Sequence, residues 1–208
     1  ITTLAVGYAL DEGKIASLDD RADRYASKLR GTLYGETTIR NLLRMASGAR
    51  YKQTYDRTSV GDTIPFNLAV WRDGIESAAH YVTARETEQG TRFYYASPHT
   101  AMLAAVVRGA TGMSLSDYLT PRLWQGIGAE ETALWLADKT GLEVAFGNFN
   151  ATLRDYARLG VVLANDGVRP DDPGAKQIIP REFLLDATDW KRAPEQFRPG
   201  RASPYWGY

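Results

Sequence analysis

The chain has 208 residues, 44% of them hydrophobic, and its 25 basic and 25 acidic side chains give a formal net charge of zero. It can therefore form a core, but it has no basic run for nucleic acid and no apolar stretch long enough to cross a bilayer. The absence of cysteine and the presence of only two histidines exclude disulfides and thiolate metal sites, so we expect neither a metal nor another cofactor.

The first predicted element is a helix over residues 1–12. Its apolar residues have helical spacing and can share one face, and Gly13 is placed to end it. No N-cap precedes Ile1, which is itself apolar, whereas chain termini are usually exposed and polar. The pattern predicts that the sequence as given begins inside a helix.

The next segments alternate between polar turns and short helices. Residues 18–25 form a polar turn or a short helix, and Thr38 is placed to cap a helix over 39–46 that Gly48 stops. A polar loop over 49–65 carries Tyr55. Loops of this length in a compact domain are usually functional or disordered. Short helices are predicted over 66–71 and 75–83.

The most informative stretch runs from Gly90 to Gly109. A turn and a short aromatic segment lead to Ser97, where an N-cap is expected, and to Pro98 at the first helical position. Residues 101–107 are apolar on every face, which predicts a helix buried all round. Tyr95 would then lie on a rigid loop at the mouth of this helix, where catalytic side chains are often held. Simple aromatic packing is the other interpretation of Tyr95.

The second half of the chain alternates helices with two strand-like runs. Ser114 and Asp117 form a capping box for a helix that ends near Trp124. The strand-like runs cover 132–136 and 143–146, with a turn at 138–141 between them. Thr152 caps the next helix, whose inner stripe is predicted to contain Leu153, Tyr156, Ala157, Leu159, Val162 and Leu163.

The C-terminal segment is predicted to contain one more short helix and a long loop. Pro180 opens the helix, which continues to Ala187, and a loop rich in proline and arginine begins at Asp189. Residues 205–208 are aromatic and β-prone, and they are interpreted as the start of a strand that the sequence cuts short.

Several stretches, in this order along the chain, together resemble the penicillin-recognising serine hydrolases. The similar branch contains class C β-lactamases, esterases, DD-peptidases and 6-aminohexanoate-dimer hydrolases. Each stretch is weak alone, but the ordered set is specific. The matching stretches are Leu10–Ile15 with Leu18–Asp20, Ile39–Leu43 with Ala46–Gly48, Gly90–Phe93 with Tyr95–Ser97, Leu123–Gly128, and Ala151–Arg158.

This resemblance implies an α+β protein with the β-lactamase/transpeptidase-like fold, in which an antiparallel sheet flanked by helices joins a mainly helical region. The chain would be one partial domain that covers mostly the helical region and is truncated at both ends. Residues 1–35 would be the remainder of the catalytic helix and a turn, 36–188 the helical region, and 189–208 a loop that leads into a missing sheet strand.

The resemblance also implies site residues. In the family, the helix that matches 1–12 carries a Ser-x-x-Lys motif in its first turn, with the serine as acylated nucleophile and the lysine as its activating partner. That motif would precede Ile1, and the family's third motif would follow Tyr208. Tyr95-Ala96-Ser97 matches the second motif, which implies a proton relay at Tyr95 and a substrate-binding role for Ser97. Tyr55 matches a substrate-contacting tyrosine, although a solvent-facing loop residue is an equally open interpretation.

Three short sequences imitate family motifs without matching their context. Lys139-Thr140-Gly141 spells the third motif but comes too early in the chain, so we interpret it as a surface turn. Ser116-Asp117-Tyr118 imitates Ser-Asp-Asn but fits the capping box better. Ser47 is followed at the required spacing by Arg50 where a lysine would be needed.

The predicted function is therefore a serine hydrolase that cleaves amide or ester bonds of a small molecule through an acyl-enzyme, with esterase or amidase activity favoured over β-lactamase activity. Family resemblance implies a periplasmic or secreted location. The alternative is a non-catalytic binding or scaffold protein that lacks the nucleophile. A third interpretation, a Ser-His hydrolase that uses Ser97 and His99, is disfavoured because residues i and i+2 of a helix point apart. The oligomeric state is left open.

Overall fold

The computed structural model describes residues 1–54, 61–171, 174, 176–198, 200–201 and 207–208. This part of the chain is mainly helical, with one small two-stranded antiparallel sheet. No helix in these ranges is both apolar and long enough for a membrane span. The elements are α1 (Thr2–Asp11), α2 (Leu33–Glu36), α3 (Ile39–Leu43), α4 (Thr63–Asp73), α5 (Ile75–Ala78), α6 (Ser97–Thr111), α7 (Leu115–Leu119), β1 (Leu134–Trp135), β2 (Phe149–Asn150), α8 (Leu153–Ala164) and α9 (Arg181–Thr188).

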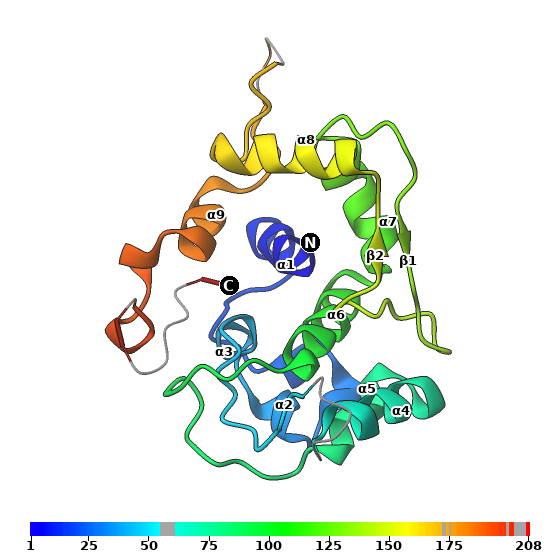
Figure 1. The fold of residues 1–208 in the computed structure, drawn as a ribbon, viewed down its shortest axis with the longest axis vertical. Coiled ribbons are helices and arrows are strands. Elements are labelled where there is room, and N and C mark those ends of the chain that lie inside the picture. Colours follow the sequence, from blue (N-terminus) through cyan, green and yellow to red (C-terminus); the bar gives the residue numbers. More distant parts are fainter. Residues whose placement is uncertain (55–60, 172–173, 175, 199, 202–206) are drawn as a thin grey trace.

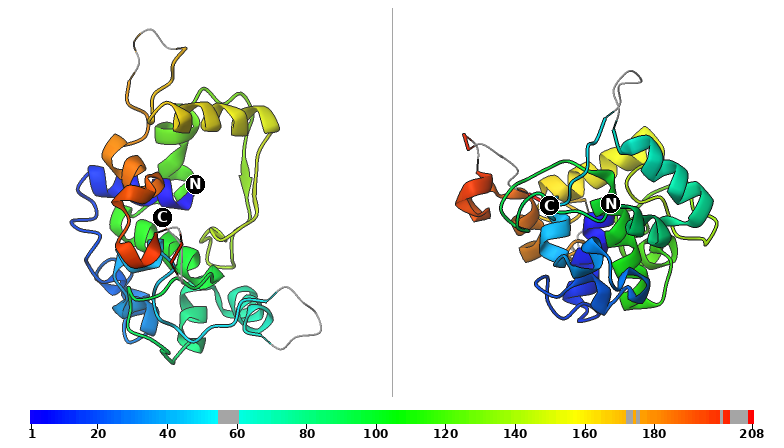
Figure 2. Two further views of the ribbon diagram at one scale, coloured as in Figure 1. Left: turned by 60° about the vertical axis from the view of Figure 1, so that its left-hand side comes forward. Right: turned by 90° about the horizontal axis from the view of Figure 1, so that it is seen from below.

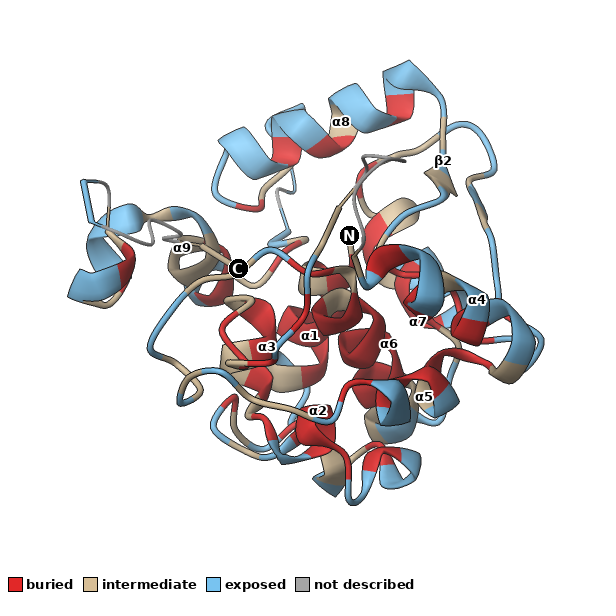
Figure 3. Ribbon diagram, turned by 60° about the horizontal axis from the view of Figure 1, so that its bottom comes forward, coloured by how far each residue is buried: buried red, intermediate tan, exposed pale blue. Residues whose placement is uncertain are grey.

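Helices α1 and α6 form the centre of the fold (Figures 1 and 3). Helix α6 is buried at nearly every position from Pro98 to Val107, which confirms the prediction of a helix buried all round. Helices α3 and α7 pack on this pair, and α9 lies against α1. Helices α4 and α5 lie at one end of the molecule and α8 crosses the opposite end (Figure 2). The two central helices therefore hold the other elements in place.

Helix α3 begins as predicted but ends early. The Thr38 side chain accepts a hydrogen bond from the Asn41 amide at 3.2 Å, so it is the N-cap. The helix stops at Leu43 rather than continuing to Ala46, because Met45 adopts a left-handed conformation with φ 51°. The chain then doubles back, and the Ala46 amide donates to the Asn41 carbonyl at 2.8 Å. This turn directs residues 46–49 toward the start of α6.

The start of α6 differs by one residue from the prediction. Ala96, in an extended conformation, is the N-cap, Ser97 is already helical, and no side chain of the N-cap itself caps the helix. The Ser97 amide instead donates to Oε1 of Gln53 at 3.0 Å. An amide side chain from a distant loop therefore satisfies a helix N–H that we expected a local hydroxyl to satisfy.

The strand-like runs pair differently from the prediction. Strand β1 lies within 132–136, but its partner is β2, with Leu134 opposite Asn150 and Trp135 opposite Phe149. The run 143–146 contributes only a single bridge, between Glu143 and Ala137. Residues 142–145 are all buried, so they pack inside the molecule. Their apolar character reflects this tertiary burial rather than a longer strand.

Helix α8 is capped by Thr152 as predicted, but its buried face is different. Of the predicted inner stripe, Leu159 and Val162 are buried, whereas Leu153 is 86% exposed. Asp155 turns inward because its carboxylate accepts hydrogen bonds from the amides of Glu130 and Glu131 at 3.0 and 3.2 Å. With Asp155 on the buried face of α8, part of the predicted apolar stripe faces solvent instead.

The remaining predictions mostly agree with the structure. Helix α4 starts at Thr63, inside the predicted 49–65 loop, and α5 continues as a short 3-10 turn over 79–81. Ser114 caps α7 and Pro180 precedes α9. The predicted terminal strand falls largely outside the described residues. Tyr208 is described and is not in a strand: its amide donates to the Ala187 carbonyl at 3.3 Å, and its hydroxyl accepts from Arg40 at 2.9 Å.

Asp138 joins α5 to the turn that follows β1. Its buried carboxylate accepts from the amides of Ile75 at 2.7 Å, Thr140 at 2.7 Å and Leu142 at 3.1 Å. Burial by itself would raise the pKa of this carboxyl, but the hydrogen bonds outweigh burial and hold the pKa below its usual value.

Asp138→Ala is expected to lower the free energy of unfolding by about 3 kcal/mol, because the buried amides of Ile75 and Leu142 and the part-buried amide of Thr140 lose a charged acceptor. A carboxyl with a lowered pKa stabilises the fold fully above its unfolded-state pKa and loses this contribution as the pH falls through its folded-state pKa. The difference between the wild type and the variant should therefore narrow below about pH 4. Urea unfolding at several pH values measures this difference in the free energy of unfolding.

Asp19→Ala, at an exposed ion pair with Arg40, is the control. It should lower the free energy of unfolding by less than about 1 kcal/mol.

Gln53→Leu should destabilise the protein by about 1 kcal/mol, the usual cost of removing an N-terminal helix cap. Gln53→Glu keeps a side-chain oxygen at the same reach and should retain most of the stability. Thermal or urea unfolding of the two variants tests the cap. Equal loss in both would show that the Ser97 amide does not depend on this oxygen.

Candidate functional site

The segment that leads into α6 is fixed by its backbone while its tyrosine remains accessible. The Gly90 amide donates to the Ala46 carbonyl at 2.7 Å, and the Tyr94 amide donates to the Met45 carbonyl at 2.9 Å. The Tyr95 side chain is 49% exposed. A phenol on a fixed backbone can meet a small molecule without the loop having to become ordered first, so its position costs little entropy on binding.

The structure places Tyr95 in the loop before α6 and Ser97, two residues later, at the first position of α6. Ser97 is half-buried and its amide is held by Gln53. Tyr55 lies outside the described residues. The sequence did not identify Gln53 as part of this site, and its position in a polar loop gives no signal of a contact with a residue so distant in the chain.

A buried polar group lies directly beneath this loop. The His99 ring is 2% exposed, with Nδ1 3.0 Å from the Ala96 carbonyl oxygen and Nε2 2.7 Å from Oγ of Ser47. Burial lowers the pKa of His99 to about 4, so the ring is neutral at physiological pH. His99 is therefore a packed residue of the interior. Both ring nitrogens of His99 are hydrogen-bonded, one to Ala96 and the other to Ser47, so the interpretation of Ser97 and His99 as a catalytic pair is wrong.

The first turns of α1 and α6 line the same depression, which has a volume of about 340 Å³. Ile1, Thr2 and Thr3 contribute from α1 and its N-terminus, and Thr100 contributes from α6. The opposite wall comes from the segment 145–149 with Trp135 and Tyr156. The loop of Tyr95 and Ser97 thus leads into the end of α6 that borders this depression.

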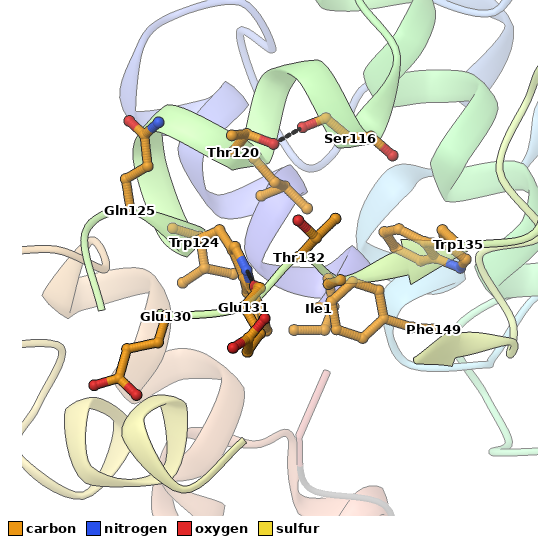
Figure 4. Close-up of a pocket in the computed structure, with 13 residues that line it drawn as sticks. Ile1, Ser116, Thr120, Trp124, Gln125, Glu130, Glu131, Thr132, Trp135 and Phe149 are labelled. Atoms are coloured by element: carbon orange, nitrogen blue, oxygen red, sulfur yellow. Dashed lines mark hydrogen bonds between the residues drawn. The ribbon is translucent and has the colours of Figure 1, made fainter. Parts of the chain in front are cut away.

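Ile1 also borders a second cavity, of about 300 Å³ (Figure 4). Its walls are mainly apolar, and the carboxylates of Glu130 and Glu131 contribute to the lining. Phe149 lines both cavities and makes edge-to-face contacts with Trp124, Trp135 and Tyr156 at ring-centre distances of 5.5, 5.0 and 6.0 Å. This aromatic cluster gives both cavities rigid, apolar walls of the kind that bind small molecules.

The sequences that imitate family motifs are structural elements. Lys139–Gly141 is an exposed turn, closed by a 3.0 Å hydrogen bond from the Gly141 amide to the Asp138 carbonyl, as predicted. The Ser114 side chain accepts from the Asp117 amide at 3.0 Å, which confirms the capping box. In the described part of the chain, no group of three or more His, Asp or Glu side chains could hold a metal ion.

Comparisons with known proteins identify the family of this chain. The β-lactamase family model matches residues 1–208. A curated relative, the 6-aminohexanoate-dimer hydrolase of Paenarthrobacter ureafaciens, is 29% identical over 170 residues, which cover 79% of this chain and 43% of the relative. A Bacillus anthracis structure provisionally described as a 6-aminohexanoate-dimer hydrolase matches with a TM-score of 0.76 at 28% identity, over 89% of this chain and 49% of that one.

More distant structures share the fold. A class C β-lactamase of Rhodobacter sphaeroides matches with a TM-score of 0.60 at 18% identity, over 90% of this chain and 53% of that one. The chain spans about half the length of the 6-aminohexanoate-dimer hydrolases that it matches. The fold of its described residues is the β-lactamase/transpeptidase-like fold, represented here mainly by helices. With the whole sequence matched by one family model, the chain belongs to the β-lactamase family.

Proposed function

We propose that the whole protein is a serine hydrolase that cleaves amide or ester bonds through an acyl-enzyme, with Tyr95 as its proton relay. One observation carries the proposal: Tyr95 lies half-exposed on a fixed loop at the start of α6, and the first turn of α6 shares a depression with the first turn of α1. In the family that this chain belongs to, the helix that matches α1 carries the Ser-x-x-Lys nucleophile.

The chemistry requires a proton acceptor beside the nucleophile. A serine hydroxyl is a weak nucleophile and must lose its proton as it attacks the carbonyl carbon. A lysine and a phenol near it can pass that proton to the leaving amine or alcohol, each after its pKa has been adjusted by its surroundings. Tyr95 supplies the phenol, and Ser97 supplies a hydrogen-bonding group on the same loop for the substrate amide.

The substrate class that we propose is a small amide or ester with an apolar body. The aromatic walls around Phe149 favour such a molecule over a highly charged one. Two of the matching proteins carry the description 6-aminohexanoate-dimer hydrolase, which supports this substrate class. The Tyr-x-Ser form of the second motif supports an esterase or amidase over a β-lactamase.

Tyr95→Phe should lower kcat by about a hundredfold or more and leave KM nearly unchanged, because it removes a proton-transferring group and keeps the ring. Steady-state kinetics of the whole protein with a p-nitrophenyl ester and with 6-aminohexanoate dimer measure the effect. Tyr94→Phe removes a hydroxyl from the neighbouring residue and serves as the matched control, with kcat close to wild type. Wild-type turnover in Tyr95→Phe would refute the relay.

A fluorophosphonate probe should label one serine of the whole protein, in a Ser-x-x-Lys segment, and p-nitrophenyl ester turnover should fall in parallel with labelling. Peptide mapping by mass spectrometry identifies the labelled serine. Labelling of Ser97, or no labelling of a protein that still hydrolyses the ester, would contradict the proposed nucleophile. Absence of both labelling and turnover would favour the non-catalytic alternative.

A further inference from the structure

His99 is a buried polar residue in the first turn of α6, and its two hydrogen bonds fix its protonation. The Ala96 carbonyl oxygen can only accept a hydrogen bond, so Nδ1, 3.0 Å away, carries the proton. In the neutral ring Nε2 is then an acceptor, and the Ser47 hydroxyl donates to it at 2.7 Å. The ring therefore bridges two chain segments in one defined orientation.

The bridge continues on the far side of Ser47. The Ala49 amide donates to Oγ of Ser47 at 3.2 Å, so donors and acceptors run in one direction from Ala49 through Ser47 and His99 to the Ala96 carbonyl. Ser47, Ala96 and His99 are each at most 2% exposed. Such aligned bonds in a dry interior polarise one another and resist displacement by water.

Other contacts hold both ends of this bridge. The Ser47 carbonyl accepts from the Arg85 guanidinium, and the Tyr34 ring packs edge-on against the His99 imidazole with ring centres 5.7 Å apart. The Ala96 carbonyl also accepts from the His99 backbone amide at 3.2 Å. The imidazole thus lies between the fixed segment 45–49 and the peptide group that joins Ala96 to Ser97.

Ala96 is the middle residue of the Tyr95-Ala96-Ser97 motif. We propose that His99 is a positioning residue for this motif: by holding the Ala96 carbonyl against Ser47, it fixes the direction in which the Tyr95 phenol and the Ser97 side chain leave the backbone. The inference rests on the proposed function of Tyr95. It assigns His99 no contact with substrate and no step of proton transfer.

Two substitutions test the two hydrogen bonds of the His99 ring one at a time. The side-chain amide of His99→Asn can donate from near the place of Nδ1 to Ala96 but cannot reach Ser47. The longer amide of His99→Gln can reach Ser47 but its side chain no longer donates to the Ala96 carbonyl, which keeps only the backbone hydrogen bond from residue 99. Both variants should lose thermal stability, and only His99→Gln should lose at least about tenfold in kcat, with little change in KM. His80→Gln, at the exposed second histidine, is the control and should leave kcat unchanged.

A double-mutant cycle tests whether His99 acts through Tyr95. In the whole protein, His99→Gln should cause little further loss of kcat when Tyr95 is already Phe, because effects of residues that act as a unit are not additive. Losses that multiply would overturn the inference, as would equal losses of kcat in His99→Asn and His99→Gln. Wild-type turnover in Tyr95→Phe refutes the proposed function itself. A defective Tyr95→Phe beside a fully active, folded His99→Gln refutes the role of His99 alone.

A measurement on the unsubstituted protein keeps the inference testable if His99→Gln does not fold. The ¹⁵N shifts of the His99 ring should report a neutral imidazole protonated at Nδ1, with the signal assigned by comparison with His80→Gln. A ring protonated at Nε2, or one that titrates near neutral pH, would show that the Ala96 carbonyl is not held by the ring, and would overturn the inference.

Discussion

The close packing of α1 against α6 is the constraint on which the rest of the structure depends. Small residues make this approach possible: Ala5 and Ala9 on α1, and Ala101, Ala104 and Ala105 on α6, are all buried. A side chain at Gly109 would collide with the Tyr25 carbonyl, and one at Gly7 would collide with the Phe183 ring of α9. Because interiors are packed as densely as crystals, a larger residue at any of these positions would displace the element packed against it.

Polar groups then connect the outer elements to this centre at long range. Asp138 reaches from the turn after β1 to the start of α5, and Asp155 reaches from α8 to the amides of Glu130 and Glu131. Gln53 and His99 hold the loop that contains Tyr95. In each case a buried or half-buried side chain satisfies a backbone group that would otherwise lose its hydrogen bonds to water, and burial without a partner is costly.

Local patterns predicted local features well. The apolar run after Pro98 identified the buried helix, and Thr38, Ser114 and Thr152 were recognised as caps because each lies three residues before the amide that it accepts from. The order of short motifs identified the family. The sequence indicates Tyr95 and Ser97 as candidate site residues because both belong to one contiguous motif, and their roles stay predictions. The role of Tyr55 stays a prediction.

The errors have a common cause, which is that a contact between distant segments decided the local structure. Ser97 could not be placed correctly without Gln53, and the face of α8 could not be predicted without the amides that Asp155 binds. Nothing in the sequence indicated that His99 has a buried partner, and only the structure shows that the partner is Ser47. Sequence spacing does not contain this information.

The dry, neutral state of His99 has a wider consequence for how the chain responds to acidity. Histidine is the side chain that ordinarily changes charge between pH 5 and 8, and this chain has only two. One of them stays uncharged down to a pH of about 4, and the other is exposed on the surface. His99 therefore adds no charge beneath Tyr95 anywhere in the neutral range, although histidine is the residue type that most often does so.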